Sequence, residues 1–244
     1  MATGDQSKKR KQRYLPQNRP AKKKGAYPLK PGVQGFFISC DGGREHQASQ
    51  EAINVIDSFF EELMHGTGLK VNSSGLLENP VNKKRRFMKL DPGCNGIAFI
   101  QMKRRDGDPS PKDIVQHGLT SAAATKKHMS RFILRLVPVE VSCYPSEEDI
   151  SRAIKPLVEQ YFPVETDNPR KFAVLYGSRA NTGVDRMKII NTVAKSIPAP
   201  HKVDLSNPEM SIVVEIVKTV CLIGVVEKYK ELAKYNLRQL TSTK

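Results

Sequence analysis

Two groups of side chains in this sequence have the chemistry to bind phosphate. One group comes at the end of a predicted helix and in the strand after it, and the other comes in a polar loop that follows a second strand. The first comprises Lys126, Lys127, Arg131 and Arg135, and the second comprises Ser178, Arg179, Asn181 and Arg186. Arg179 is the strongest candidate, because a planar guanidinium can hold a phosphate through two parallel hydrogen bonds. The hydroxyl and amide of the second group could add neutral hydrogen bonds.

Each of these side chains also has a purely structural interpretation. Arg179 could pair with a carboxylate, and Asn181 could satisfy the backbone of a turn. Lys126 and Lys127 could be a solvated helix end, where the helix dipole favours positive charge. The residues alone leave both interpretations open.

The overall charge favours a polyanionic partner. The 244 residues include 40 Lys and Arg against 25 Asp and Glu, a formal net charge of +15. Residues 1–31 carry ten basic residues and one acidic residue, with four prolines and few apolar side chains. Such a segment cannot bury enough surface to offset its ordering entropy, so residues 1–32 are predicted to be a disordered basic tail. Its basic clusters at 8–11 and 22–24 are typical of nuclear import or nucleic-acid contact, which predicts a location in the nucleus, including the nucleolus, with some cytoplasmic presence.

The sequence carries none of the common enzyme motifs and no membrane span. It has no G-x-S-x-G elbow, no G-x-x-x-x-G-K-[ST] phosphate loop and no strand followed by G-x-G-x-x-G. The four cysteines and five histidines are scattered, so we expect no metal site and no cofactor, and the cysteines are interpreted as buried thiols. The longest apolar run falls far short of the roughly 18 residues that a membrane helix needs. No apolar segment follows the N-terminal charges, so a secretory signal is not expected.

Hydrophobic periodicity predicts alternating strands and helices. Apolar residues recur on one helical face in residues 47–64, and short apolar runs predict strands that include 35–40, 96–102, 131–137, 171–176, 211–217 and 220–226. In the 131–137 strand, simple alternation places Phe132 and Leu134 on a core face and Arg131 and Arg135 on the other. Pro156 is expected to kink the helix that begins near residue 146. The pattern predicts an α/β chain in two units that divide near residues 105–111.

One part of the sequence resembles a known RNA-binding family. The run F-A-V-L-Y-G-S-R at 172–179, with Asn181 and Arg186, is followed by K-V-D-L-S-N-P at 202–208 and by strands near 213–216 and 220–226. These segments resemble the THUMP domain, an RNA-binding module shared by tRNA thiouridine synthases, methylases and some pseudouridine synthases. The whole chain is similar to the eukaryotic THUMP-domain adaptors of tRNA cytidine acetylation.

The resemblance implies a fold and a set of partners. It implies a ferredoxin-like domain at 33–108, a THUMP domain at 109–230 and a basic C-terminal tail at 231–244. It also implies a protein that binds tRNA, with Lys202 among the binding residues, and presents it to an RNA cytidine acetyltransferase that forms N4-acetylcytidine in the D-arm. Such an adaptor is not an enzyme, has no acetyl-CoA site and takes no small-molecule substrate. Where the related adaptors often have an acidic insert, residues 72–86 are short and basic.

Two other functions remain open at this point. The chain could be an RNA-modifying enzyme with an unrecognised site, which binding of acetyl-CoA or S-adenosylmethionine would reveal. It could also be a general ribosome-assembly factor, which would bind ribosomal RNA as tightly as tRNA.

Overall fold

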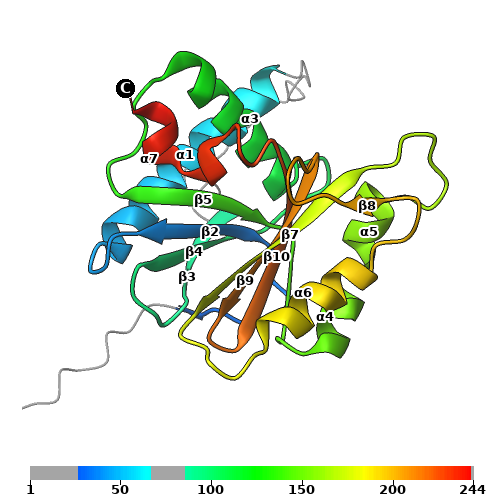
Figure 1. Cartoon of the computed structure of the whole chain (residues 1–244). Coiled ribbons are helices and arrows are strands. Elements are labelled where there is room, and N and C mark those ends of the chain that lie inside the picture. Colours follow the sequence, from blue (N-terminus) through cyan, green and yellow to red (C-terminus); the bar gives the residue numbers. More distant parts are fainter. Residues whose placement is uncertain (1–26, 67–85, 243–244) are drawn as a thin grey trace, which may run out of the picture.

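The computed structural model describes residues 27–66 and 86–242 of the chain, which form two five-stranded mixed sheets with helices (Figure 1). This arrangement confirms the predicted α/β class. The basic clusters of the predicted tail and residues 72–85 of the basic stretch lie outside the described residues.

The first sheet has the strand order β1-β3-β4-β2-β5. Strand β2 lies antiparallel to both β4 and β5, and β3 pairs antiparallel with β4. One helix follows β2 and another follows β4, so the chain makes two interleaved βαβ units, which is the ferredoxin-like arrangement that was predicted. The elements are β1 (Tyr27–Pro28), β2 (Gly35–Cys40), α1 (Glu45–Gly66), β3 (Phe87–Asp91), β4 (Ile97–Met102), α3 (Pro111–Thr125) and β5 (Ile133–Val139).

The first unit extends to Val139 rather than to residue 108. The sequence had assigned α3 and β5 to the second domain, but β5 pairs along the length of β2 and α3 packs beside α1. A ferredoxin-like sheet needs its second helix and fourth strand to cover and complete the first three strands. The division between the two units therefore falls at Glu140, between β5 and β6.

Ordered backbone also begins earlier than predicted. Tyr27 and Pro28, placed by composition in a disordered tail, pair in parallel with Leu90 and Asp91 of β3. The amide of Gly32 then donates to the carbonyl oxygen of Ser142 at 2.9 Å. The prediction of disorder rested on the lack of apolar side chains in this segment. The segment is ordered because its backbone forms hydrogen bonds with residues that are distant in the sequence.

The second sheet has the order β6-β10-β9-β7-β8, with β9 parallel to β7 and antiparallel to β10. Helices α4, α5 and α6 cover one face of it (Figure 1). The predicted kink at Pro156 is a break at Ile154, which ends α4 and precedes α5. The elements are β6 (Val141–Cys143), α4 (Glu147–Ala153), α5 (Lys155–Tyr161), β7 (Lys171–Arg179), α6 (Arg186–Lys195), β8 (Lys202–Val203), β9 (Met210–Val217) and β10 (Val220–Glu227).

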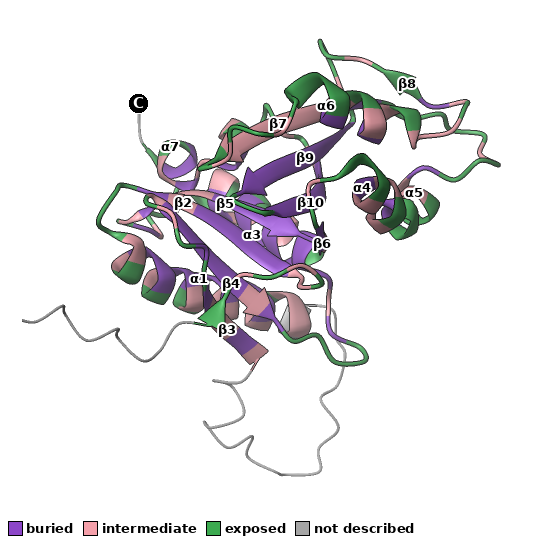
Figure 2. Ribbon diagram, turned by 90° about the horizontal axis from the view of Figure 1, so that it is seen from below, coloured by how far each residue is buried: buried purple, intermediate pink, exposed green. Residues whose placement is uncertain are grey.

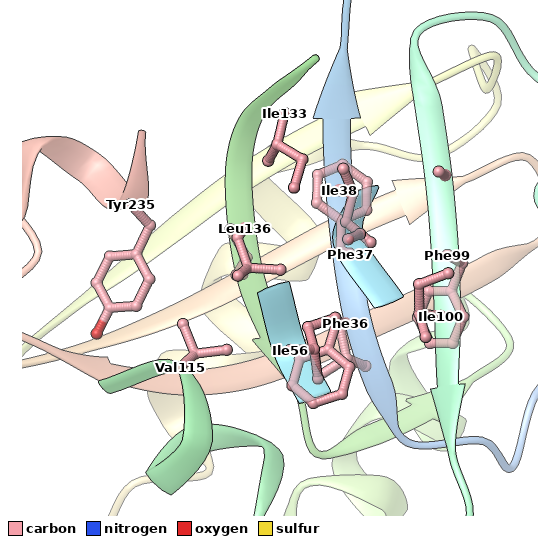
Figure 3. Packing of buried hydrophobic residues seen from close by; sticks show 14 of the residues in the cluster. Phe36, Phe37, Ile38, Ile56, Phe99, Ile100, Val115, Ile133, Leu136 and Tyr235 are labelled. Atoms are coloured by element: carbon pink, nitrogen blue, oxygen red, sulfur yellow. The ribbon is translucent and has the colours of Figure 1, made fainter. Parts of the chain in front are cut away.

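The two sheets share one hydrophobic core. Phe36, Phe99 and Leu136 of the first sheet pack with α1 and α3, and Val213 and Leu222 of the second sheet belong to the same cluster (Figure 3). Strands β9 and β10 are buried on both faces, because alternate side chains point to the first unit and to α4–α6 (Figure 2). Most residues of both strands are therefore apolar, with Ser211 and Glu215 of β9 as buried polar exceptions.

The C-terminal segment returns to the first unit and is part of its core. It contains the short helices η1 (Ala233–Tyr235) and α7 (Leu237–Thr241). Tyr235, Leu237 and Leu240 are buried in the first cluster, so the segment predicted as a basic C-terminal tail at 231–244 packs on the first unit over its described residues, up to 242. Its basic residues are exposed or half-buried, while the apolar residues between them point inward.

Candidate nucleic-acid interface

The end of β7 presents Arg179 to solvent on a rigid support. The sequence predicted that this strand would stop near Tyr176, but β7 continues to Arg179, which pairs with Val217 of β9. Arg179 is exposed, and no side-chain hydrogen bond or salt bridge holds its guanidinium within the described residues. A cation held by a strand end and left open to water is suited to phosphate binding.

Ser178 and Asn181 hold the loop that follows Arg179. The Ser178 hydroxyl donates to the carbonyl oxygen of Asn181 at 3.1 Å. The Asn181 side chain accepts from the amides of Gly183 and Val184 and donates through Nδ2 to the carbonyl oxygen of Lys218 at 2.6 Å. Both side chains therefore make hydrogen bonds within the protein, and these bonds fix the loop next to Arg179.

Lys218 is a cation that the sequence analysis did not single out. It is exposed at the first position of the two-residue turn between β9 and β10, with a φ of 54°. Its Nζ lies beside the β3–β4 turn of the first unit, since a methyl group on Gly93 would come within 2.5 Å of it. The signal that could have found it is the V-K-T-V sequence, a polar Lys-Thr pair between two β-branched runs, which marks a tight turn between two strands.

The charges of Arg179 and Lys218 both act on one thiol of the first unit. Burial raises the pKa of the Cys94 thiol in the β3–β4 turn, and the positive charges of Lys218 and Arg179 partly offset that rise. Two elements of the second sheet therefore place their cations over one turn of the first sheet. The strand order, and not the spacing in the sequence, brings these residues together.

The other predicted group lies at the same end of the first sheet. Strand β5 begins where β2 ends, because Ile133 pairs with Cys40, and the Cys40 amide donates to Gly96 at the end of the β3–β4 turn. The exposed Lys127 and Arg131 are in the segment that leads from α3 into β5 (Figure 1). We call this end of the molecule the basic rim: Lys126, Lys127, Arg131, Arg179 and Lys218.

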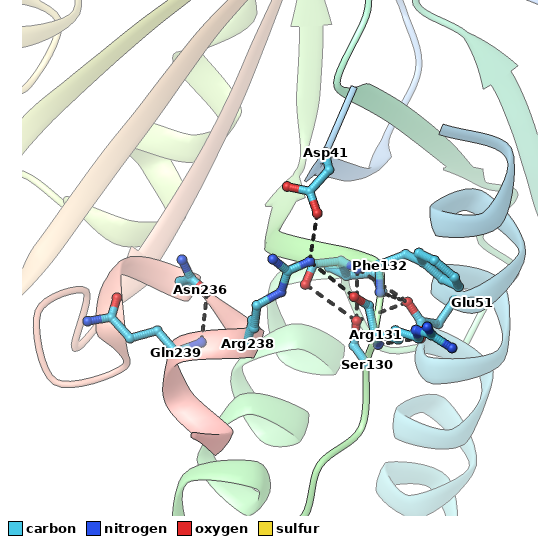
Figure 4. A network of polar contacts seen from close by, with 9 residues as sticks. Asp41, Glu51, Ser130, Arg131, Phe132, Asn236, Arg238 and Gln239 are labelled. Carbon is cyan, nitrogen blue, oxygen red and sulfur yellow. Dashed lines mark hydrogen bonds and ion pairs between the residues drawn. The ribbon is translucent and has the colours of Figure 1, made fainter. Parts of the chain in front are cut away.

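A carboxylate holds the Arg131 segment in place (Figure 4). Glu51 of α1 accepts hydrogen bonds from the amides of Arg131 and Phe132, at 2.6 and 2.8 Å, and from the Ser130 hydroxyl at 3.0 Å. Arg238 of α7 donates to the Arg131 carbonyl oxygen and to Asp41, both at 3.0 Å. The backbone around Arg131 is therefore fixed while its guanidinium, 5.6 Å from the Phe132 ring centroid, stays exposed.

Lys126 and Lys127 differ in how far they are engaged. Lys126 caps α3 in a left-handed conformation, and its Nζ donates to the carbonyl oxygen of Leu240 at 3.2 Å. No hydrogen bond or salt bridge of the Lys127 side chain is recorded among the described residues, and it is exposed. Lys127 is therefore the freer of the two cations.

Arg135 has a structural role in place of the predicted one. Its guanidinium donates to the Tyr229 hydroxyl and to the carbonyl oxygen of Lys234, and it lies 3.9 Å from Glu215 of the second sheet. Burial raises the pKa of the Glu215 carboxyl, and Arg135 and then Arg179 partly offset the rise. The register shift between Ser39 and Cys40 breaks the simple alternation along β5. The second face of β5 meets the second sheet, so Arg135 points into the junction of the units and is half-buried there.

Arg186 and Lys202 lie on elements other than those that form this rim. Arg186 is the exposed first residue of α6, behind the N-cap Asp185. Lys202 pairs with Lys171 at the first residue of β7, eight residues from Arg179 at its last. At about 3.3 Å per residue, that is roughly 26 Å away. Four of the nine predicted residues thus lie in the rim, and Ser178 and Asn181 support it. Arg135 is in an ion pair between the two units, and the other two residues lie elsewhere.

The described residues offer no metal site and no membrane span. No group of three or more His, Cys, Asp or Glu side chains among them could hold a metal ion. None of the helices in the part of the chain that the structure describes is both long and apolar enough to cross a bilayer.

Comparison with known proteins places this surface in a family. The THUMP domain family matches residues 144–226, which include β7, β9, the Lys218 turn and all of β10 except its last residue. The chain is 29% identical to THUMP domain-containing protein 1 of Mus musculus, over 97% of this chain and 73% of that protein. It is 33% identical to the Drosophila melanogaster homolog of that protein, over 88% of this chain and 76% of the homolog.

One solved structure carries the same domain name. The solution structure of the THUMP domain of THUMP domain-containing protein 1 is 34% identical and covers 33% of this chain and 84% of its own, with a TM-score of 0.30. THUMP is an RNA-binding domain, so Arg179 and Lys218 lie on an RNA-binding module.

Proposed function

The chain belongs to the THUMP domain-containing protein 1 family, and from this membership we propose that it is a non-catalytic tRNA-binding adaptor. In this proposal it presents tRNA to an RNA cytidine acetyltransferase, which forms N4-acetylcytidine in the D-arm. The observation that carries the RNA-binding part is the basic rim, where the Arg179 strand end and the Lys218 turn meet the first unit.

The chemistry of the rim suits a folded RNA. The deep, narrow major groove of an RNA helix hides its base edges, so proteins recognise such helices through phosphates, sugar hydroxyls and shape. The rim offers exposed cations on strand ends and turns that are fixed by hydrogen bonds, and these cations come from both units. Because the backbone that carries these cations is already fixed, binding a phosphate backbone costs little conformational entropy in the protein main chain.

The adaptor role is tested by the nucleosides of small RNA. Cells with and without the protein are compared by nucleoside mass spectrometry, and we expect selective loss of N4-acetylcytidine from tRNA while other modified nucleosides stay unchanged. Rescue with Arg179→Glu combined with Lys218→Glu is expected to fail. Rescue with Lys202→Glu, a charge reversal far from the rim, serves as the matched control and is expected to succeed.

Other results would redirect the proposal. An unchanged level of N4-acetylcytidine in tRNA would contradict the acetylation role, and only the RNA-binding part of the proposal would stand. Equal affinity of the purified chain for ribosomal RNA and tRNA would favour ribosome assembly, and binding of acetyl-CoA or S-adenosylmethionine would make the chain an enzyme. We further propose a nuclear location, supported by the basic clusters at 8–11 and 22–24.

A further inference from the structure

Two of the four cysteines, which are 78 positions apart in the sequence, are direct neighbours in the second sheet. Cys143 is the last residue of β6, and its partner across the antiparallel ladder with β10 is Cys221. Both side chains belong to the cluster under α4–α6, so they point to the same face of the sheet. Spacing along the chain suggested unrelated core thiols, and only the sheet register pairs them.

The ladder geometry is compatible with a covalent bond. Directly opposite residues of an antiparallel pair have Cα atoms about 4.5 or 5.5 Å apart, and both values fall within the roughly 4.4–6.8 Å that a disulfide spans. Their Cβ atoms lie about 4.5–5.5 Å apart, against about 3.5–4.5 Å in a disulfide. Closing the strands by up to about 1 Å is therefore enough to form the bond.

The two thiols differ in access. Cys221 is fully buried in a central strand, whereas Cys143 retains 8% of its surface exposed. Cys143 ends an edge strand of three residues, and the next residue, Tyr144, is 58% exposed. A small oxidant reaches Cys143 first, and Cys221 is then placed to resolve the oxidised sulfur.

We propose that Cys143 and Cys221 are a modification site at which a hydroperoxide drives formation of an intrachain disulfide. The Cys143 sulfur takes one oxygen atom from hydrogen peroxide, giving a sulfenic acid, and one water is released. The Cys221 sulfur then attacks the Cys143 sulfur, forming the S–S bond and expelling the hydroxyl as a second water with the proton of Cys221. Both thiols are oxidised by one electron each, and one peroxide is reduced to two waters.

The bond would tie the junction of the two units. Strand β6 follows directly from β5 of the first unit, and Cys221 lies three residues after Lys218 in the strand that leaves the β9–β10 turn. The disulfide fixes the edge strand β6 to the base of that turn. It forms whether or not the chain binds RNA.

The test is peptide mapping of the full chain after oxidation. The protein is treated with hydrogen peroxide, its remaining thiols are alkylated, and it is digested and analysed by mass spectrometry without reduction. We expect a linked pair of peptides containing Cys143 and Cys221, about two hydrogen masses lighter than the free peptides, which disappears on adding a dithiol reductant. The half-buried Cys94 reports that the oxidant has reached the protein.

Two variants make the assignment specific. Cys143→Ser is expected to leave Cys221 as a thiol, while Cys94→Ser is expected to form the same linked pair as the wild type. Oxidation of Cys94 with Cys143 and Cys221 both still alkylated as thiols would overturn the proposal. So would a linked pair containing Cys40 and Cys94 in place of Cys143 and Cys221.

Discussion

The backbone amide of Lys218 donates a hydrogen bond to the carbonyl oxygen of Arg179 at 2.9 Å. The turn between β9 and β10 is therefore held to the end of β7. The side-chain Nδ2 of Asn181, in the loop after β7, donates a second hydrogen bond to this turn, at the carbonyl oxygen of Lys218. Two cations that lie 39 positions apart in the sequence are presented side by side. This pair is the centre of the basic rim.

Charge reversal at Arg179 is expected to weaken tRNA binding without unfolding the protein. A hydrogen bond to a charged group contributes about 1.5–3 kcal/mol, so Arg179→Glu is expected to lower affinity by about tenfold or more. Filter binding measures the affinity and thermal unfolding checks the fold. Lys202→Glu, at the other end of β7, is the control, and equal effects of the two variants would remove the rim as the binding surface.

Lys127 is expected to contribute more than Lys126 to the salt dependence of binding. Each phosphate contact adds about 0.7–0.9 to the slope of log affinity against log salt. Lys127→Ala is expected to lower the slope by the amount of one phosphate contact. Lys126→Ala is expected to lower it less, because the ammonium group of Lys126 already donates to the carbonyl oxygen of Leu240. Titrations at several salt concentrations measure both slopes, and an unaltered slope for Lys127→Ala would place that lysine outside the interface.

Arg135 is expected to affect stability before it affects binding. Arg135→Met removes the ion-pair partner of the buried Glu215 carboxylate, whose Oε2 already has no hydrogen-bond partner, and leaving such a buried polar group uncompensated costs about 1–3 kcal/mol. Urea unfolding is expected to show that loss. Adding Glu215→Gln is expected to recover part of it, and a double variant no more stable than Arg135→Met would mean that the two side chains do not interact.

Glu215 also predicts a pH dependence of stability. Burial raises the pKa of this carboxyl above its ordinary value of 4.5, with Arg135 and Arg179 opposing. The folded chain holds the proton more tightly than the unfolded chain, so the stability that Glu215 contributes is complete below about pH 4.5 and is lost as the pH rises through the folded pKa. Glu215→Gln is expected to gain stability relative to wild type as the pH rises from 4.5 to 7. A difference between the two curves that does not change with pH would contradict this origin.

The C-terminal segment is expected to be essential for the stability of the first unit. Leu237 is fully buried, and truncating a buried leucine to alanine costs about 2–5 kcal/mol. Leu237→Ala is expected to lower Tm by several degrees, while Gln239→Ala, at an exposed position two residues on, leaves it unchanged. Equal thermal unfolding of both variants would mean that the segment is a free tail in solution.

The sequence predicted local structure where one periodic pattern extends over a whole element. The apolar face of residues 47–64 became α1, and the β-branched runs at 211–217 and 220–226 became β9 and β10. It failed where the pattern is short. The five residues of β3 were overlooked after a basic stretch, and β7 was ended three residues early because Gly177 and Ser178 favour loops.

The sequence by itself determined the fold class, the THUMP segment and the excess of positive charge, because these depend on residue types and on neighbours a few positions apart. Only the tertiary structure decided which cations are free. Arg135 and Arg131 look equivalent on one strand, yet the second sheet covers Arg135 and leaves Arg131 in water. The same holds for Lys218 with Arg179 and for Cys143 with Cys221. Strand order and register set these contacts, and both arise from burying two sheets against each other, a long-range condition that no local pattern records.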